Sequence, residues 1–436
     1  MADHKDPKDG AHRQATAVLT RGFDPRLSLG SARPAVFRSS TYVFSSPEAA
    51  ERAFDVATGR AQEREGEDVE LIYSRISHPN AQILEEQIVP LERGAKSALV
   101  FNSGMAAIMT ALMTFLRPGD TVVYTKPLYG GSMHLIHDYL SLFGVSGIGV
   151  AAGRSADLDS AIRGADNLGV VFLETPANPT MTMVDIRRAA ATAAERARRP
   201  LIMVDNTFLG PIFQHPLTLG ADLILYSATK FLSGFSDMLG GVALARDPAL
   251  IQQMRGTRIL FGNILQPDEC WLMDGRLPTV SLRMNKQSKN AQRVAERLAR
   301  HPRILAMHYP TLFTDAEQIR IRLAQCEFPL LCQGKTILHG VRDAHSGREI
   351  HNASGPLKGV GRAHENLQLP GRSLATIELE QTAGQNSCLV FSFHAEEFQH
   401  RLITRLLKLV LTHVSLRLRD EKRRSASSKP TSRSCH

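Results

Sequence analysis

The 436-residue chain is longer than an ordinary single domain, and 43% of its residues are hydrophobic, enough for sizeable buried cores. No apolar run reaches the roughly 18 residues that a membrane span needs, and the N-terminal MADHKDPKDGAHRQ lacks the apolar stretch of a secretory signal. The five cysteines are scattered, odd in number and without metal-ligand spacing. This pattern predicts a reduced, cytoplasmic chain with no metal site and no membrane partner.

The net charge of +9 is concentrated at one end of the chain. Residues 401–436 hold ten Lys or Arg against two Asp or Glu, so this segment alone carries +8. A basic polar tail of this kind is typical of disorder. No zinc-finger, RNA-binding or helix-turn-helix pattern accompanies it, so we expect a solvated tail and no nucleic-acid partner.

Residues 1–65 are predicted to form an arm with short helical pieces, in which 38–46 (RSSTYVFSS) is a plausible short strand. From about residue 72, short apolar runs alternate with helical segments, which indicates parallel strands joined by crossover helices in an α/β fold. The apolar runs lie within 96–116, 120–132, 170–181, 201–208 and 221–231.

Beyond Gly241 we expect a hinge-like stretch and then a long helix over 281–301, where apolar residues recur largely at helical spacing. After about residue 329 the periodicity is poor. The sequence therefore predicts four parts, and we list them in chain order: an arm (1–65), a large domain (66–262), a smaller C-terminal domain that diverges after about 328 (263–400), and a helix with a basic, disordered tail (401–436).

Polar and small residues follow each apolar run, at the strand ends where ligands bind in α/β folds. They are Ser103, Gly104, Met105, Tyr129, Asn178, Asp205, Ser227, Thr229 and Lys230. Each alone has an ordinary explanation as a helix cap, a turn residue or a surface lysine. Together they supply what pyridoxal 5'-phosphate needs: an anion nest, a stacking ring, a carboxylate for the ring nitrogen, an amide for the ring hydroxyl and a lysine for covalent attachment.

Six motifs, in order, resemble the Cys/Met-metabolism (transsulfuration) family of pyridoxal-phosphate-dependent enzymes. They are YSRISHPN (73–80), FNSGMAAI (101–108), PLYGGS (127–132), ETPANP (174–179), VDNTF (204–208) and YSATKFLSGFSDMLGG (226–241). The family includes cystathionine gamma-synthase, cystathionine gamma- and beta-lyases, and methionine gamma-lyase. The resemblance implies fold type I of these transferases, as in aspartate aminotransferase, with a large, mostly parallel sheet domain and a smaller α+β C-terminal domain that is atypical here.

The resemblance also implies roles for the residues at the strand ends. Lys230 would bind the coenzyme covalently and move protons, Asp205 would face the ring nitrogen, and Tyr129 would stack on the ring and assist proton transfer. Asn178 would touch the ring 3-hydroxyl. The phosphate would be held at two strand ends, by Gly104, Met105, Ser227 and Thr229, with Ser103 beside them.

Tyr73 and Arg75 would reach the phosphate of the neighbouring subunit, because the family builds each site across a dimer. A homodimer or homotetramer is therefore expected. The implied reaction is elimination or replacement at the beta or gamma carbon of an amino-acid substrate such as cystathionine, methionine or an activated homoserine. The sequence leaves open whether the enzyme is a synthase, a gamma-lyase or a beta-lyase.

The C-terminal region departs from the family pattern. Relatives carry an arginine there that binds the substrate carboxylate, whereas the matching stretch of this sequence, 387–398, places Phe391 at that point. A phenyl ring cannot form the bidentate pair. Several alternatives stay open. Either Arg362 or Arg372 substitutes for the missing arginine, or an altered reading frame or ordinary divergence changed this region. Alternatively, the chain binds the coenzyme with impaired catalysis.

Overall fold

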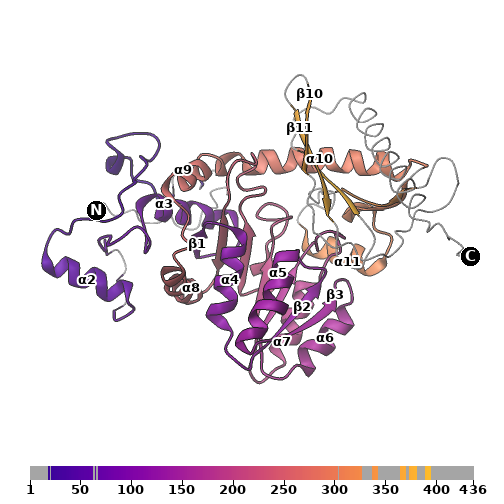
Figure 1. The fold of residues 1–436 in the computed structure, drawn as a ribbon, viewed down its shortest axis with the longest axis horizontal. Helices are drawn as coiled ribbons and strands as arrows, with labels where there is room; N and C mark the ends of the chain where they lie inside the picture. The colour runs from indigo at the N-terminus through magenta and orange to yellow at the C-terminus, as the bar shows by residue number, and fades with distance from the viewer. Residues whose placement is uncertain are drawn as a thin grey trace, which may run out of the picture.

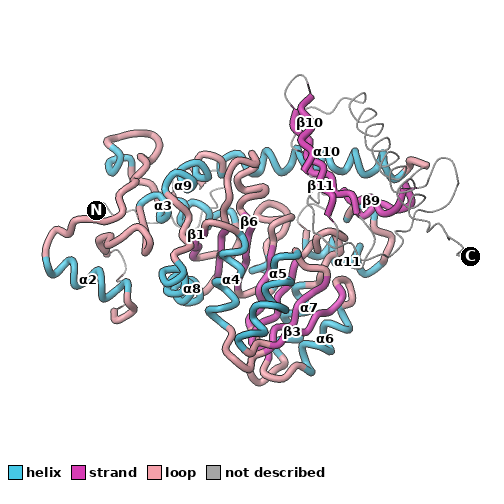
Figure 2. The backbone as a smooth tube through the Cα atoms, in the orientation of Figure 1, coloured by secondary structure: helices cyan, strands magenta, loops and turns pink. Residues whose placement is uncertain are grey.

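The computed structural model describes residues 18–19, 21–61, 64, 67–302, 304–326, 336–341, 364–369, 373–380 and 388–393. The described strands form two sheets, one of seven strands (β1–β7) and one of five (β8–β12), which lie in different parts of the molecule (Figures 1 and 2). The basic tail, Arg362 and Arg372 lie outside the described residues.

The seven-stranded sheet alternates with helices along the chain, as the sequence predicts. Its strands are β1 (Ser97–Phe101), β2 (Thr121–Lys126), β3 (Ser146–Ala151), β4 (Leu168–Glu174), β5 (Leu201–Asp205), β6 (Leu223–Ser227) and β7 (Gly241–Ala245). Its helices are α3 (Pro79–Ile88), α4 (Gly104–Phe115), α5 (Gly130–His134), α6 (Ser155–Gly164), α7 (Ile186–Ala194) and α8 (Pro248–Phe261). Short 3-10 or π turns are η1 (Pro25–Ser28), η2 (Val89–Leu91), η3 (Leu135–Tyr139), η4 (Leu140–Phe143), η5 (Pro216–Leu219), η6 (Leu277–Thr279) and η7 (Pro310–Leu312).

The strand order is β1-β7-β6-β5-β4-β2-β3, and the strands from β6 to β3 are parallel. Strand β7 is antiparallel to both of its neighbours, β1 and β6. Strand β1 therefore runs in the same direction as β6, and the carboxyl ends of β1, β2, β4, β5 and β6 meet at one edge. This mostly parallel α/β sheet confirms the fold class.

Both faces of the sheet are buried, which explains the continuous apolar runs of its strands. Val122 and Phe172 share one core with α4 and α8, whereas Val123 and Val171 point the other way into a core with α6 and α7. Near β1 and β7 this second face is covered by α3 and α9 (Pro267–Asp274). The alternation follows from the two-residue side-chain period of a strand.

The N-terminal segment contains α2 (Pro47–Ala57) and extends away from the sheet (Figure 1). The expected strand over 38–46 is wrong: only Thr41 pairs, in an isolated antiparallel bridge with Tyr73. A strand needs several successive residues that pair with a neighbouring strand, whereas in this segment a single residue has such a pairing partner. Side-chain contacts fix the arm instead, since Arg38 forms an ion pair of 2.6 Å with Asp268 of α9.

The expected hinge after Gly241 is also wrong, because strand β7 and helices α8 and α9 follow directly. Asp247 caps α8 at its start and Gly262 ends it at φ 68°, so the chain carries ordinary helix boundary signals. The expected long helix is confirmed as α10 (Val280–Ala299), which reaches toward the second sheet (Figure 1).

The second sheet is antiparallel, in the order β10-β11-β12-β9-β8. Its elements are β8 (Ile304–His308), β9 (Thr336–Val341), β10 (His364–Leu369), β11 (Ser373–Glu380) and β12 (Cys388–Phe393), with α11 (Ala316–Gln325) between β8 and β9. Phe391 lies in β12, paired with Ile377 and Thr336. Among the described helices, none has the length and apolarity to cross a bilayer.

Candidate active site

Strand β7 brings together the two strand ends that the sequence assigns to a phosphate. Its first residue, Gly241, pairs with Phe101 at the end of β1 and with Ser227 at the end of β6. A Cβ added to Gly104 would lie 2.8 Å from the Ser227 Cβ. The turn after β1 and the turn after β6 are therefore in contact, and only a glycine at position 104 allows it.

The N-terminus of α4 forms an anion nest within this contact. Ser103 caps the helix, and its hydroxyl accepts the Ala106 amide at 3.1 Å. The amides of Gly104 and Met105 make no hydrogen bond within the described part of the chain, as expected for the first turn of a helix. Two free N–H groups at the positive end of the helix dipole favour a bound anion.

Lys230 lies in the tight turn that follows β6. Its amide donates to the Ser227 carbonyl at 3.1 Å. The neighbouring Thr229 hydroxyl accepts the Gly240 amide at 3.0 Å and donates to the Gly240 carbonyl at 3.3 Å. The turn is thus closed against the start of β7, while the lysine side chain is exposed.

Asp205 ends β5, the strand beside β6, and is buried with 8% of its surface exposed. Burial raises the pKa of its carboxyl group above the ordinary 3.8, against hydrogen bonds from Thr207 that favour the charged form. Thr207 donates to Asp205 Oδ1 at 2.6 Å and accepts the Ser227 amide at 2.8 Å. Thr207 is a positioning residue that the sequence analysis missed, although its hydroxyl follows the strand in the motif VDNTF.

Glu174 is a second missed residue, and it organises the loops of Tyr129 and Asn178. It ends β4, accepts the Tyr129 amide at 2.8 Å through one oxygen and accepts the Asn178 amide at 2.7 Å through the other. Its position as the last residue of a fully buried strand was the signal. The carboxylate thereby fixes the loops after β2 and β4 relative to each other.

The side chains of Tyr129 and Asn178 remain available for a ligand. Asn178 is 7% exposed, yet its Oδ1 has no hydrogen-bond partner among the described residues, and a buried amide atom without a partner is costly unless something binds there. A Cβ on Gly131 would lie 2.8 Å from Tyr129 Cε1 and 3.0 Å from Met105 Sδ. The Tyr129 ring and the Met105 side chain therefore flank the same small residue.

Tyr73 and Arg75 lie elsewhere, at the C-terminal end of α8. Arg75 donates to the Ile259 carbonyl at 2.5 Å, and its guanidinium lies 5.5 Å from the centroid of the Tyr73 ring. Both residues are exposed. Among the described residues, neither side chain makes a hydrogen bond with the anion nest or with the turn of Lys230.

The residues at the sheet edge fit pyridoxal 5'-phosphate in kind. The nest and the Ser227 hydroxyl suit a phosphate, the buried Asp205 suits a pyridinium nitrogen, and the side-chain oxygen of Asn178 suits a ring hydroxyl. The glycine contact at position 104 leaves the nest uncovered by a side chain. No group of acidic, His or Cys side chains in the described part of the chain is arranged to hold a metal ion.

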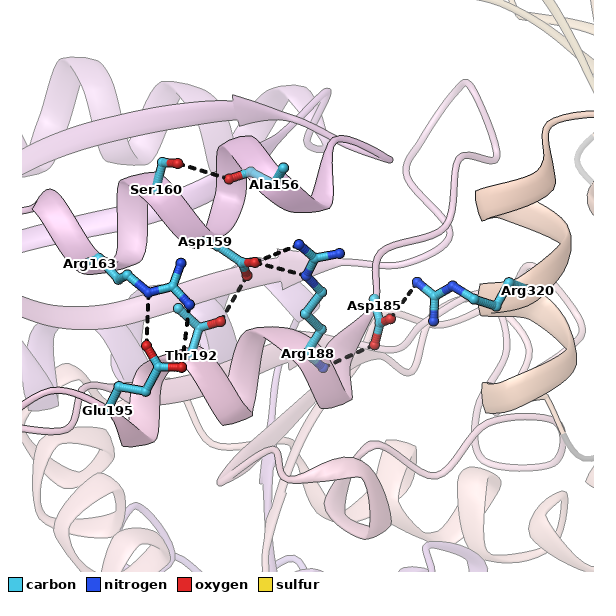
Figure 3. A network of polar contacts seen from close by, with 9 residues as sticks. All are labelled: Ala156, Asp159, Ser160, Arg163, Asp185, Arg188, Thr192, Glu195 and Arg320. Atoms are coloured by element: carbon cyan, nitrogen blue, oxygen red, sulfur yellow. Dashed lines mark hydrogen bonds and ion pairs between the residues drawn. The ribbon is translucent and has the colours of Figure 1, made fainter.

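A cavity of about 530 Å³ lies between α7 and α11, away from these residues. It is lined by Arg187, Arg188 and Arg320, but Arg188 pairs with Asp159 and Arg320 with Asp185, each at 2.8 Å (Figure 3). The paired carboxylates offset the positive charge. This cavity lies where α11 meets the large domain, and none of the predicted site residues lines it.

A lysine turn, an anion nest, a buried carboxylate and a free amide at the carboxyl edge of this sheet define the fold type I class of pyridoxal-phosphate-dependent enzymes. A model of the family described as Cys/Met metabolism PLP-dependent enzyme matches residues 15–327. The chain belongs to this family and is a pyridoxal-phosphate-dependent enzyme.

Relatives in sequence and structure agree with this assignment. The L-methionine gamma-lyase of Pseudomonas putida is 37% identical over 300 residues, 68% of this chain and 71% of that protein. The cystathionine beta-lyase MetC of Bacillus subtilis is 40% identical over 240 residues, 55% of this chain and 60% of that protein.

The crystal structure of metB from Corynebacterium glutamicum superimposes with a TM-score of 0.72 at 25% identity, covering 91% of this chain and 96% of that one. Apo CalE6, a methionine gamma lyase from Micromonospora echinospora, gives a TM-score of 0.64 at 33% identity, with 75% and 80% covered. These relatives lend no support to the alternative of a coenzyme-binding chain with impaired catalysis.

Proposed function

We propose that this enzyme breaks or exchanges a bond at the beta or gamma carbon of a sulfur amino acid or an activated homoserine. The observation that carries the proposal is the meeting of the Lys230 turn with the anion nest of α4 and the buried Asp205 at one sheet edge. The substrate class is supported by relatives that are named as methionine gamma-lyases and as a cystathionine beta-lyase. A lyase and a synthase both fit this geometry.

In this proposal each residue acts on the coenzyme or on a proton. The bound coenzyme supplies an electron-withdrawing ring that makes the bonds at the substrate alpha carbon labile. Asp205 keeps the ring nitrogen protonated, and Thr207 orients Asp205. Lys230 would hold the coenzyme, and its amine, when free, would move protons. Tyr129 stacks on the ring and is placed to assist proton transfer.

The chain is proposed to work as a homodimer or homotetramer. Tyr73 and Arg75 are exposed, and among the described residues their side chains form no hydrogen bond with the site of their own chain, which supports a role in the site of a neighbouring subunit. We also propose the domain boundaries expected from the sequence and a cytoplasmic location, where the thiols of Cys270 and Cys326 would stay reduced. The proposed ligand of the substrate carboxylate is Arg362, Arg372 or another group.

The lysine assignment is tested by reducing the purified protein with borohydride, which makes the link to the coenzyme permanent, and then mapping the labelled peptide. We expect the label on Lys230 and its loss in Lys230→Ala. Lys126 is a matched control, because it ends β2 at the same edge of the sheet and is also exposed. Label that stays in Lys230→Ala, or that is lost in Lys126→Ala, contradicts the assignment.

The reaction is tested with L-cystathionine, L-methionine and O-succinylhomoserine, by measuring 2-oxobutanoate for gamma-elimination, pyruvate for beta-elimination, or cystathionine when cysteine is added to the last substrate. Absence of product from all of them would count against the proposed substrate class. The shared site is tested by mixing Lys230→Ala subunits with Arg75→Ala subunits. Hybrids should regain activity, because one site of each hybrid has both residues intact; failure of every mixture to exceed the separate variants contradicts the shared site.

A further inference from the structure

The backbone of the Lys230 turn is held by a complete set of hydrogen bonds to its carbonyl groups. Inside the turn, the Ala228 carbonyl accepts the Ser233 amide at 2.9 Å and the Lys230 carbonyl accepts the Gly234 amide at 2.8 Å. The Ser233 hydroxyl donates to the Thr229 carbonyl at 2.9 Å. The next two carbonyls, those of Phe231 and Leu232, find their donors outside the turn.

Those two donors come from one side chain, Arg283 of α10. Its Nη1 donates to the Phe231 carbonyl at 2.8 Å and its Nη2 to the Leu232 carbonyl at 3.0 Å. The same guanidinium is anchored to its own helix end, through Nη2 to the Arg276 carbonyl at 3.2 Å and through Nε to the Thr279 hydroxyl at 3.1 Å. Arg283 therefore ties the turn to the start of α10 in the manner of a two-pronged fork.

The turn is shaped to admit this guanidinium. Gly234 has a φ of 78°, and a Cβ placed on it would overlap Arg283 Nη1. A side chain at this position would thus be strained by the backbone conformation and would also displace the arginine. Glycine in the motif FLSG therefore serves the approach of Arg283 as well as the turn.

Within the described part of the chain, Arg283 pairs with no carboxylate, which is unusual for a half-buried cation. Burial, with help from the neighbouring Arg276, lowers its pKa to about 10, so it stays charged at neutral pH. Its hydrogen bonds go instead to three backbone carbonyls and the Thr279 hydroxyl. A lysine has one nitrogen and could not span the same acceptors, since Arg presents its donors from a rigid planar fork.

We propose that Arg283 is a positioning residue that fixes the Lys230 turn and so holds the lysine amine at the coenzyme carbonyl. This inference rests on the proposed role of Lys230. It extends that role to a helix that also reaches the second sheet, so the placement of the lysine depends on the start of α10.

The test is the rate at which hydroxylamine displaces Lys230 from the coenzyme of the holoenzyme, followed by coenzyme absorbance over a range of pH. If Arg283 fixes the turn, Arg283→Met lowers the effective concentration of the amine, and exchange becomes faster by about tenfold. Arg283→Lys keeps the charge but not the fork, so its rate should fall between those of the unmodified enzyme and Arg283→Met. If Arg283→Met does not fold, the exchange rate of Arg283→Lys alone tests the proposal.

Arg276→Met is the matched control, because Arg276 contacts the same loop through Asp237, which is 49% exposed. The Arg276 side chain is itself only 13% exposed, but among the described residues it donates its hydrogen bonds to Asp237 and none to a carbonyl of the turn, so exchange in this variant should stay within about twofold of the unmodified enzyme. Exchange rates for both Arg283 variants equal to that of Arg276→Met would overturn the proposal, even if their melting temperatures fall. If borohydride labels a lysine other than Lys230 in the unmodified protein, the proposed function fails first, and the two failures are distinguishable.

Discussion

Replacing Glu85 with glutamine should destabilise the large domain strongly. Glu85 lies on α3 with 5% of its surface exposed, and it is paired with Arg258, which is fully buried, at 2.8 Å and with Arg255 at 2.9 Å. Its Oε1 also accepts the Val100 amide at 3.1 Å. A glutamine keeps one carbonyl oxygen and presents an N–H pair to a guanidinium, so a buried positive charge is left uncompensated.

Removing one partner of a buried ion pair typically costs about 3–5 kcal/mol. The adjacent Glu86 provides the control, because it is on the same helix and pairs with Arg21 at 3.0 Å, with both side chains about half exposed, at 50% and 45%. Glu86→Gln should cost no more than about 1 kcal/mol, as exposed pairs do. The free energy of unfolding is measured by urea titration of Trp271 fluorescence, since this single tryptophan lies on α9, which packs against α3.

The pH dependence of this difference gives a second check. Burial by itself would raise the pKa of Glu85, but Arg255, Arg258 and the Val100 amide outweigh it and hold the pKa below the ordinary 4.5. A depressed pKa in the folded state means that Glu85 stabilises the protein above pH 4.5 and loses this contribution as the pH falls through the folded value. The difference in the free energy of unfolding between Glu85→Gln and the unmodified protein should therefore decrease as the pH falls. Equal costs for Glu85→Gln and Glu86→Gln at pH 7 would refute the reasoning.

Other predictions concern the site and the arm. Asp205→Asn should stabilise the coenzyme-free protein by on the order of 1 kcal/mol above pH 3.8, because burial raises the pKa of this carboxyl group and its charged form is costly; it should also weaken coenzyme retention, and calorimetry with dialysis checks both. Gly104→Ala should weaken coenzyme binding by about tenfold or more, because its Cβ would lie 2.8 Å from the Ser227 Cβ; a titration with unchanged affinity contradicts the nest. Arg33→Ala should shift Trp271 emission and cost about 1 kcal/mol, because the guanidinium lies 4.0 Å from the indole centroid and holds the arm on α9; an unchanged emission spectrum would count against this contact.

Much of the site could be predicted because its residues follow strands that are recognisable in the sequence. Each buried strand is an uninterrupted apolar run, and the first polar residue after it is necessarily at the carboxyl edge of a parallel sheet. Asp205, Ser227 and Lys230 were singled out in this way, and the structure places Asp205 and Ser227 at the ends of adjacent strands and Lys230 in the turn after the second. The expected strand over 38–46 failed because alternation in a short segment does not state whether a partner strand exists.

Residues that act through others could not be found in this way. Glu174 and Thr207 form hydrogen bonds that link different strands. Arg283 donates to the carbonyl of Leu232, which is 51 residues away in the sequence. Nothing in their local sequence distinguishes them from an ordinary strand-end carboxylate, a turn threonine or a surface arginine on an amphipathic helix.

The sequence by itself determined the alternation of strands and helices, the family and the chemical kinds of group at the strand ends, because these follow from local hydrophobic period and short motifs. Only the tertiary structure decided that β7 lies antiparallel between β1 and β6 and so places Gly104 against Ser227. It also decided that Tyr73 and Arg75 lie at the end of α8, away from the other predicted residues. The physical reason is that hydrogen-bond register and side-chain packing join segments far apart in the chain, and no local pattern encodes which partner a strand or a guanidinium will meet.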